Sequence, residues 1–474
     1  MSRADRTTEL AVIGAGPAGY PAAFRAADLG MDVTLIDPEP NPGGVCLYRG
    51  CVPSKALLHV SRLLHEIERA PEWGVSCGDV RVDVERVRAW KNAVVDKLTK
   101  GVGYLCRQRG IDYVRGRAAF RDARTLTLEL HEGGQETLAF ERAVIATGSR
   151  AAWLPGLPDS PLVMSSERAL DIEEVPERLL VVGGGYIGLE LGQLYAALGS
   201  RVTVVEIMPE LLSGADCDLV RPLAEAVKDQ FEAIYLESKV VEIAEAGDGL
   251  VARLEGEAVQ DKEQRFGRAL IAVGRKPNSG TAGLENTGVE VDEQGFIKID
   301  HQCRTAEPNL FAVGDVAGPP MLAHKGTHQG VVAAEAAAGK KTAFEPQAIP
   351  AVVFSDPEVA WTGLSETDAK RQGRKVSVAR FPWGASARAV TIGRTDGVTK
   401  LILDPETQRV LGMGVAGAGA GELVGQGSIA IEMGAVAEDL ALIIQPHPTL
   451  SETVMEAAES AVGQGLHFYS RRRT

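Results

Sequence analysis

The stretch Leu10-Ala-Val-Ile-Gly-Ala-Gly-Pro-Ala-Gly19 decides the fold of this chain. Its apolar start predicts a buried strand, its glycines predict a tight turn, and the pattern from Tyr20 to Leu29 predicts a helix. A second apolar strand, Val33 to Ile36, ends at Asp37. Strand, glycine turn, helix, strand and acid together predict a βαβ unit that binds a dinucleotide, with the pyrophosphate at the helix N-terminus.

The same arrangement returns later in the chain. Leu179 to Val182 predicts a strand, Gly183-Gly-Gly-Tyr-Ile-Gly188 a turn, and Leu189 to Leu198 a helix. The next strand, Val202 to Val205, ends at Glu206. One glycine pattern can arise by chance, but two complete patterns predict two separate dinucleotide sites. The acid favours NAD over NADP at the second site, because a carboxylate accepts hydrogen bonds from a ribose 2′-hydroxyl and repels a 2′-phosphate.

Two further segments are typical of the FAD domain in flavoproteins that carry two such units. Ala146-Thr-Gly148 follows the apolar strand Ala143 to Ile145, and Leu310-Phe-Ala-Val-Gly-Asp315 ends in a Gly-Asp pair whose acid would hydrogen-bond the ribitol chain. The first glycine pattern is therefore expected to bind FAD, which leaves the second for NAD.

The expected fold class is α/β, with two Rossmann-like dinucleotide-binding domains and a C-terminal α+β domain. After about residue 345 no nucleotide pattern occurs; Ala348 to Ala360 and Gly397 to Gly414 predict strands, and Gly421 to Met433 predicts a helix. This last domain is expected to form a subunit interface. The predicted domains are 1–150 (FAD, first part), 151–275 (NAD), 276–345 (FAD, second part) and 346–474 (dimerisation).

Composition narrows the classes of partner. The formal charge of −14 over 474 residues argues against nucleic acid and against an anionic membrane. The longest apolar run, Leu179 to Gly199, contains Glu190 and Gln193, so it predicts strand, turn and helix instead of a membrane span. The first residues, Met1-Ser-Arg-Ala-Asp-Arg6, lack the apolar segment of a signal peptide. We expect a cytoplasmic protein, and the mature form of an organellar matrix protein also fits.

A pair of cysteines follows the first glycine pattern, in Gly43-Gly-Val-Cys-Leu-Tyr-Arg-Gly-Cys-Val-Pro-Ser-Lys55. The other cysteines are scattered singly, and no second Cys/His cluster completes a zinc site, so no metal is predicted. Cys51 precedes a helical pattern from Ala56 to Ala70, where the helix dipole favours a thiolate. Cys46, earlier in the loop, is expected to be the more accessible sulfur. A thiol pair beside a flavin can pass two electrons to it.

A second candidate for chemistry is the segment Gln445-Pro-His-Pro-Thr-Leu-Ser-Glu452. The two prolines restrict the backbone of His447, and Glu452 could hold its Nδ1 so that Nε2 faces a substrate. Such a pair predicts a general base that works near neutral pH. The other histidines are expected to be ordinary side chains.

In this order, the two glycine patterns with GGxCxxxGCxPSK, ATG, GDxxxxPMLAHK and HPTLSE resemble the class I pyridine nucleotide–disulfide oxidoreductases along nearly the whole chain. The resemblance, closest to the lipoamide-type members, implies tightly bound, non-covalent FAD, NAD, and a homodimer with shared active sites. It implies oxidation of dihydrolipoamide, carried by a lipoyl-bearing acyltransferase or carrier protein of a 2-oxoacid dehydrogenase or glycine cleavage complex. The alternative is an NAD(P)H-dependent reductase of another disulfide.

The resemblance also assigns roles to residues. Cys46 and Cys51 match the redox disulfide, with Cys51 nearer the flavin. His447 and Glu452 match the base that the other subunit supplies, and Lys55 and Glu190 match a pair near flavin N5. Residues that match FAD contacts are Gly14, Gly16, Gly19, Asp37, Gly44, Lys55, Ala118, Thr147, Gly148, Asp315 and Ala323. Residues that match the NAD side are Gly183, Gly185, Tyr186, Ile187, Gly188, Glu206, Val240, Gly274 and Arg275.

Sibling families are separated by local differences. Mercuric reductases and large thioredoxin reductases carry a C-terminal cysteine pair, and Gly463 to Thr474 contains none. Two positions depart from the lipoamide type. Tyr48-Arg49 replaces the Asn-Val of many members, and the aromatic Tyr186 resembles a lid over the flavin, although it could equally be simple packing.

Overall fold

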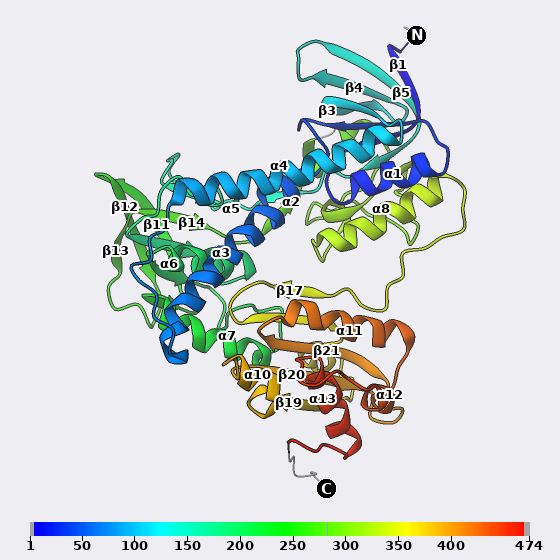
Figure 1. Cartoon of the computed structure of the whole chain (residues 1–474). Helices are drawn as coiled ribbons and strands as arrows, with labels where there is room; N and C mark the ends of the chain where they lie inside the picture. The colour runs from blue at the N-terminus through cyan, green and yellow to red at the C-terminus, as the bar shows by residue number, and fades with distance from the viewer. Residues whose placement is uncertain (1–3, 282, 469–474) are drawn as a thin grey trace. The chain divides into compact units, whose positions relative to one another are not determined.

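The computed structural model describes residues 4–281 and 283–468, which contain both helices and strands (Figure 1). The chain forms two compact units. Unit 1 contains the chain up to Leu57, Asp83–Ala152 and Gly274–Glu345, and unit 2 contains Leu58–Val82, Trp153–Val273 and the chain from Pro346 onward. The predicted α/β fold class, with two Rossmann-like folds and a C-terminal α+β part, is confirmed.

Unit 1 is built on a parallel sheet in the order β3-β2-β1-β5-β16. Its strands are β1 (Arg6–Ile13), β2 (Val33–Asp37), β3 (Asp112–Asp122), β5 (Gln135–Ile145) and β16 (Leu310–Ala312). The strand β4 (Thr125–Leu130) pairs antiparallel with the outer halves of β3 and β5, and β6 (Ser149–Ala151) pairs with β15 (Arg275–Pro277) in a separate ribbon. The apolar residues of the central strands are buried on both faces of this sheet, as in parallel sheets covered on both sides.

Helices cover this sheet and carry the cysteine segment. The helices α1 (Gly19–Asp28) and α8 (Ala323–Ala337) lie side by side (Figure 1) and close one core with Val12 and Leu35. The short α2 (Gly44–Arg49) contacts the long α4 (Val84–Gln108). The helix α3 (Cys51–Arg69) begins at Cys51, five residues before the predicted start at Ala56. It is followed by a 3₁₀ turn, η1 (Ala70–Trp73).

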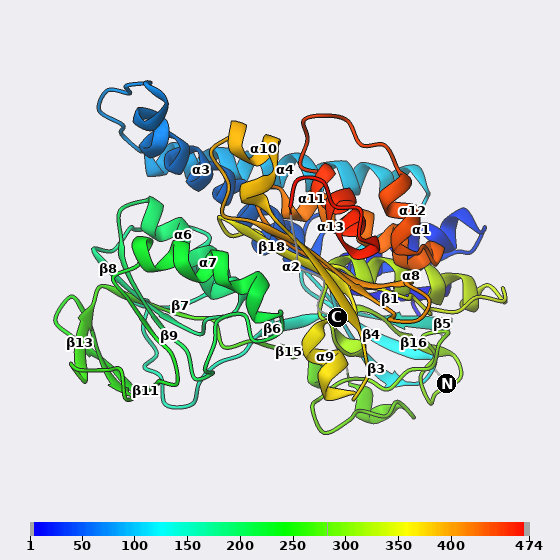
Figure 2. The ribbon, with the colours of Figure 1, turned by 90° about the horizontal axis from the view of Figure 1, so that it is seen from below.

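Unit 2 contains a second parallel sheet in the order β10-β9-β8-β14-β7. Helices α6 (Tyr186–Ala197) and α7 (Cys217–Gln230) lie on one face of it (Figure 2). The strands of this sheet are β7 (Val163–Ser165), β8 (Arg178–Val182), β9 (Arg201–Val205), β10 (Ala233–Tyr235) and β14 (Arg268–Ile271). A separate antiparallel sheet is formed by β11 (Lys239–Ala246), β12 (Gly249–Glu255) and β13 (Glu263–Phe266).

The C-terminal part of unit 2 is an antiparallel sheet in the order β17-β18-β21-β20-β19. Its strands are β17 (Ala351–Val353), β18 (Glu358–Gly363), β19 (Ser377–Pro382), β20 (Val398–Leu403) and β21 (Val410–Gly417). The helix α11 (Ala420–Met433) packs on β18 and β21, and α13 (Glu452–Val462) packs on β19 and β20. The remaining helical turns are α5 (Ser166–Ala169), α9 (Glu366–Arg371), α10 (Ala387–Thr391), α12 (Ala437–Leu442), η2 (Ser279–Thr281), η3 (Leu284–Asn286), η4 (Gly314–Ala317) and η5 (Trp383–Ala385).

Among the described residues, no helix is long and apolar enough to cross a membrane. The apolar run from Leu179 to Gly199 forms β8 and the mostly buried α6, as its embedded polar residues predicted.

Candidate active site

The two glycine turns have the same local geometry. Gly14 and Gly183 adopt φ of +96° and +110°. A Cβ atom on either residue would lie 2.4 Å from a backbone carbonyl oxygen, that of Ala146 and that of Ala272 respectively. Only glycine fits such positions, because the conformation is left-handed and the space is filled. Each turn is therefore pressed against the carboxyl end of a neighbouring parallel strand, where nucleotides bind in such sheets.

The acid at the end of each second strand holds its own glycine turn. Asp37 Oδ2 accepts the N–H of Ala15 at 2.7 Å, and Glu206 Oε2 accepts that of Gly184 at 2.5 Å. Both bonds span 22 residues, and each acid's other oxygen accepts the N–H two residues later. A carboxylate offers about four lone-pair positions, so each acid keeps acceptors for ribose hydroxyls. Burial raises the pKa of Asp37 above its ordinary value, against the opposing effect of these hydrogen bonds.

Space for a pyrophosphate exists at both turns. Gly185 has no atom within 4 Å of a built Cβ, and at Gly16 the nearest is the Cα of Gly44 at 3.8 Å. Gly185 immediately precedes α6, whose N-terminal N–H groups favour an anion. Gly19 and Gly188 allow the helices to pack closely against the turns, since a Cβ on them would lie 1.8 and 2.0 Å from a carbonyl oxygen. The residues present therefore fit two dinucleotides.

Asn278, which the sequence did not single out, fixes the ATG turn. The hydroxyl of Thr147 donates to the carbonyl of Asn278 at 3.0 Å, and the Asn278 amide donates to the carbonyl of Thr147 at 3.0 Å. Gly148 adopts φ of +68°, and its carbonyl accepts the N–H of Asn278 at 2.9 Å. The turn is thus fastened to the segment that follows β15.

Asp315 is held by a chain of hydrogen bonds that the sequence did not predict. Its Oδ2 accepts the hydroxyl of Ser149 at 2.5 Å, and Ser149 Oγ in turn accepts Arg275 Nε at 2.7 Å. Arg275 also donates to the Ser149 carbonyl at 2.8 Å. The resemblance placed Arg275 on the NAD side, but the residue belongs to unit 1 and its guanidinium is bound to the partner of the predicted flavin contact.

The 3₁₀ turn that carries Asp315, η4, receives hydrogen bonds from a buried lysine. Lys325, in the first turn of α8 after Ala323, is 4% exposed and donates to the carbonyls of Gly314, at 3.2 Å, and Gly318. Burial lowers the pKa of Lys325 below its ordinary value. The ammonium group thereby supplies hydrogen-bond donors to the backbone carbonyl groups at the two ends of this 3₁₀ turn.

The cysteine segment is fastened to the first glycine turn. The N–H of Gly43 donates to the carbonyl of Ala15 at 2.8 Å, and a Cβ on Gly44 would lie 2.5 Å from the Cα of Gly16. Gly44 has φ of +55°, so any other residue would be both strained and obstructed. The start of α2 is therefore placed directly against the loop expected to hold the FAD pyrophosphate.

Cys46 and Cys51 interact directly, and both carry thiols in this structure. A hydrogen bond with the Cys51 side chain, followed by burial, raises the pKa of the Cys46 thiol far above its ordinary value. The expected order of exposure was wrong: Cys51 is exposed and Cys46 is half-buried. The reason is that Cys46 lies within α2 and not in a loop, and Gly50 turns the chain back across it, with a Cβ position 3.3 Å from the Cys46 Cα.

The unusual Tyr48 and Arg49 serve to hold the loop before α2. The Tyr48 hydroxyl lies 3.1 Å from the backbone nitrogen of Asn41 and 3.0 Å from its carbonyl oxygen, so it accepts from one and donates to the other. Arg49 forms an ion pair with Glu39. These bonds tie the cysteine segment to the residues after Asp37.

Glu190, on the helix that follows the second glycine turn, has a contact within unit 2 that was not predicted. It is buried on α6 and accepts the N–H of Phe354 at 2.9 Å. Lys55 belongs to unit 1, so the proposed pairing of Lys55 with Glu190 stays a prediction. Tyr186 is the first residue of α6 and is 42% exposed. The remaining predicted contacts lie on β3 (Ala118), on α6 (Ile187), on β11 (Val240) and directly before β15 (Gly274, the first residue of the last segment of unit 1).

His447 and Glu452 are brought together as predicted from their spacing. His447 Nδ1 lies 2.8 Å from Glu452 Oε1, and Glu452 Oε2 accepts the N–H of Thr449 at 2.8 Å. His447 is mostly exposed and Glu452 is half-buried at the start of α13. The imidazole is therefore oriented by a fixed carboxylate, and most of its surface is exposed.

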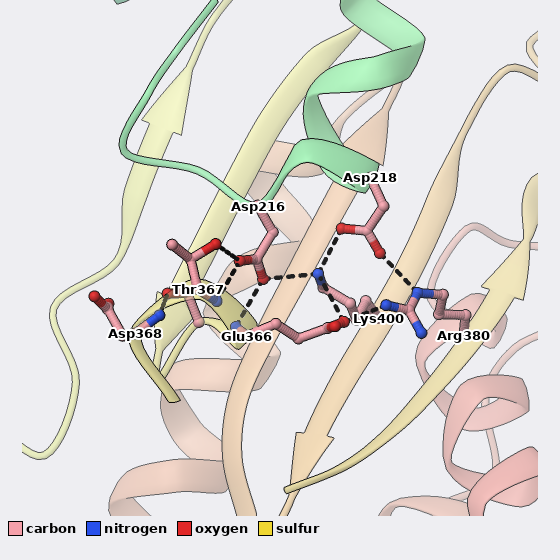
Figure 3. Close-up of polar contacts among 8 residues, drawn as sticks. Asp216, Asp218, Glu366, Thr367, Asp368, Arg380 and Lys400 are labelled. Carbon is pink, nitrogen blue, oxygen red and sulfur yellow. Dashed lines mark hydrogen bonds and ion pairs between the residues drawn. The ribbon is translucent and has the colours of Figure 1, made fainter. Parts of the chain in front are cut away.

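One group of acids in the described residues has the spacing of metal ligands: Asp216, Asp218 and Glu366. Their oxygens instead surround the ammonium group of Lys400, at 2.7, 2.6 and 3.3 Å (Figure 3). A cation is already in place, so this cluster does not call for a metal.

A fold with two dinucleotide turns, one of which carries a cysteine pair, is that of an oxidoreductase acting between thiols and a nicotinamide. Residues 8–330 match the family described as pyridine nucleotide-disulphide oxidoreductase, and residues 349–458 match its dimerisation domain. The chain belongs to the pyridine nucleotide–disulphide oxidoreductases.

Curated relatives cover nearly the whole chain. The dihydrolipoyl dehydrogenases of Vibrio cholerae and Haemophilus influenzae are 45% and 46% identical, over 95% of this chain and 95% and 94% of their own lengths. That of Haloferax volcanii is 44% identical over 98% of each chain. Among solved structures, LpdA from Mycobacterium tuberculosis has a TM-score of 0.88 at 25% identity, covering 96% of this chain and 99% of its own. The HOCl-induced flavoprotein disulfide reductase RclA from Escherichia coli has a TM-score of 0.84 at 27% identity, covering 95% and 99%.

Proposed function

We propose that this protein oxidises the dithiol of a dihydrolipoyl group to the disulfide and reduces NAD⁺ to NADH. The observation that carries the proposal is the contact between Cys46 and Cys51 on a segment fastened to the first glycine turn. The curated relatives of full length share this named activity. They favour it over reduction of another disulfide by NAD(P)H.

The thiol chemistry is a double exchange. In the oxidised protein Cys46 and Cys51 form a disulfide, and a substrate thiolate attacks the sulfur of Cys46. A mixed disulfide forms and Cys51 leaves as a thiolate at the N-terminus of α3, where the helix dipole stabilises its charge. The second substrate thiolate then attacks the substrate sulfur, which closes the product disulfide and releases Cys46. One electron pair has moved from the substrate to the cysteine pair.

The proton from each substrate thiol needs an acceptor. We assign this role to Nε2 of His447 of the partner subunit, because Glu452 occupies the Nδ1 side of the ring. The dimerisation domain at residues 349–458 includes both residues and supports a homodimer with shared sites.

Bound FAD would supply the hydride chemistry between the reduced cysteines and NAD⁺, and the protein's residues would hold and orient the two nucleotides. On the FAD side, Gly14, Gly16 and Gly19 form the phosphate turn, Asp37 receives ribose hydroxyls, and Asp315 keeps its Oδ1 for the ribitol chain. On the NAD side, the corresponding set is Gly183, Gly185, Gly188 and Glu206. Lys55 and Glu190 are assigned to the region near the reacting flavin atoms.

The proposed organisation keeps the domains 1–150, 151–275, 276–345 and 346–474, supported by the chain leaving unit 1 after Ala152 and returning at Gly274. The lipoyl group would arrive on an acyltransferase or carrier protein, as the resemblance of the sequence motifs implies. We propose that the protein works in the cytoplasm, where such complexes meet NAD⁺.

Steady-state rates test the proposal. The protein should oxidise dihydrolipoamide with NAD⁺ much faster than with NADP⁺, and should reduce glutathione disulfide slowly with either NADH or NADPH. A faster reaction with glutathione disulfide would favour the alternative. Glu206→Ala should lessen the preference for NAD⁺ by removing both the acceptor for the 2′-hydroxyl and the repulsion of a 2′-phosphate.

A further inference from the structure

The C-terminal sheet holds a fully buried lysine whose partners come from outside that sheet. Lys400 on β20 is 0% exposed, and its ammonium contacts Asp216 and Asp218 at the start of α7 and Glu366 at the start of α9 (Figure 3). The helix α7 belongs to the Rossmann-like fold of unit 2. A buried ammonium without carboxylates would be strongly unfavourable, so these bonds fix α7 on the sheet.

A second cation, Arg380, lies beside Lys400, so the carboxylates have to compensate two neighbouring positive charges. Arg380 on β19 stands directly opposite Lys400 in the antiparallel register. Like charges at such positions repel each other. Arg380 donates to Asp218 at 2.7 Å and also pairs with Glu366, so the same carboxylates bridge both cations. Packing adds to the attachment: Leu219 of α7 fills the place of a side chain at Gly414 on β21, where a Cβ would lie 2.3 Å from Leu219 Cδ1.

Asp216 does not cap its own helix, because its carboxylate binds Lys400 and the start of α9 instead. It occupies the N-cap position of α7 but makes no side-chain bond to its own helix. Instead its carboxylate accepts the N–H groups of Glu366 and Thr367, each at 2.9 Å, and the Thr367 hydroxyl at 2.8 Å. Burial alone would raise the pKa of Asp216, but Lys400 and these donors outweigh it and lower the pKa to about 2. The residue stays charged at any physiological pH.

The segment that ends at Asp216 begins at Glu206, the acid beside the second glycine turn. Glu206 holds the N–H of Gly184 through its carboxylate, and the N–H of Leu212 donates to the carbonyl of Gly184 at 3.1 Å. The residues from 206 to 216 therefore run from the glycine turn to the sheet, with one end fixed at each. No other element of secondary structure interrupts this connection.

We propose that Lys400 and Asp216 are positioning residues for nucleotide binding, which hold the segment from Glu206 to Asp216 in the arrangement that the NAD ribose requires. The inference rests on the proposed assignment of NAD to the second glycine turn. Neither residue touches the nucleotide in this account; both act through Glu206.

Calorimetric titration of the oxidised holoenzyme with NAD⁺ tests the proposal directly and without turnover. The double variant Asp216→Ala/Lys400→Met removes the Lys400–Asp216 part of the attachment together with both buried charges, so it should fold even where Lys400→Met alone leaves unpaired acids. We expect it to bind NAD⁺ at least about fivefold more weakly, the lower end of typical coupling between separate sites. The KM for dihydrolipoamide and the FAD content should stay within about twofold, well below that coupling.

Arg380→Met is the matched control, because it removes a neighbouring cation of the same cluster and leaves the Lys400–Asp216 bond in place. It should bind NAD⁺ like the wild type. The proposal is overturned if the double variant keeps wild-type NAD⁺ affinity, with or without a lower melting temperature, or if Arg380→Met weakens NAD⁺ binding equally. Failure of the wild type itself to bind NAD⁺ would instead refute the nucleotide assignment on which the proposal rests.

Discussion

The imidazole Nδ1 of His447 lies 2.8 Å from Glu452 Oε1, while the other oxygen of that carboxylate is held by the N–H of Thr449. The carboxylate is therefore held in place by the backbone, with its other oxygen directed at Nδ1 as an acceptor. This fixes the proton on Nδ1 and leaves Nε2 as the basic nitrogen.

We predict that His447→Gln slows the reduction of the enzyme by dihydrolipoamide by about 10²–10⁴-fold, the usual contribution of a positioned base. Glu452→Gln should slow the same step less, because it disturbs the ring's orientation and keeps the base. Stopped-flow mixing separates this step from reoxidation by NAD⁺, which should be nearly unchanged. A matching loss in both steps would contradict the role of His447.

Mixed dimers test whether the site is shared between subunits. Dimers that combine a His447→Gln chain with a Cys46→Ser chain would contain one intact site if the base comes from the partner, and none if each chain is self-sufficient. We predict recovery of a substantial part of the wild-type rate on co-expression with two affinity tags. No recovery in purified mixed dimers would exclude the shared arrangement.

Arg275 distinguishes the two nucleotide sites. Because its guanidinium holds Ser149, which holds Asp315, we predict that Arg275→Met weakens FAD binding and leaves the KM for NAD⁺ nearly unchanged. Fluorescence of released FAD upon dilution measures the first quantity. Arg150→Met is the comparison variant, since Arg150 lies on the same ribbon but donates to Pro277 and Asn278 instead of to Ser149. The reverse result would support the predicted place of Arg275 on the NAD side.

His65 gives a stability effect that depends on pH. Its Nδ1 lies 3.4 Å from Asp356, and this bond raises the pKa of His65 above its ordinary value of about 6.5, although burial opposes the shift. Arg394, which also pairs with Asp356, and Glu68 are the other charges that act on this imidazole. A raised folded-state pKa adds stability that is complete below the unfolded pKa and is lost as the pH rises through the folded pKa.

The free energy of unfolding of wild type should therefore exceed that of His65→Gln most at about pH 5.5, and the difference should shrink by about pH 8.5, two values that bracket the ordinary pKa of histidine. Urea denaturation at the two pH values measures this. A difference that grows with pH would show that the neutral form is the one stabilised.

Local sequence patterns were sufficient to predict the fold class and the acids beside each glycine turn. The two acids Asp37 and Glu206 stand at strand ends beside their glycine turns, so the order of strand, turn and helix placed them. His447 and Glu452 were likewise found from a spacing of five residues.

Contacts between segments that are far apart in the sequence could not be predicted from local patterns. Lys400 and Asp216 are separated by 184 residues, and nothing near either one in the sequence indicates the other. The bonds of Arg275 to Ser149, 126 residues away, likewise had no local signal, and the place of Arg275 on the NAD side stays a prediction. The greater exposure of Cys51 depends on the turn at Gly50, which the spacing of the cysteines does not reveal.

The central claim is that Cys46 and Cys51 pass electrons from a dithiol toward the flavin, with Cys51 next to it. The most direct measurement is the absorbance spectrum of the anaerobic holoenzyme on addition of dihydrolipoamide, in the wild type and in Cys46→Ser and Cys51→Ser. We predict a long-wavelength band from a Cys51 thiolate beside oxidised FAD in the wild type. Cys46→Ser should show this band without any dithiol, and Cys51→Ser should lack it, with FAD bound in all three. A band that persists in Cys51→Ser, or either variant oxidising dihydrolipoamide at the wild-type rate, would contradict the account.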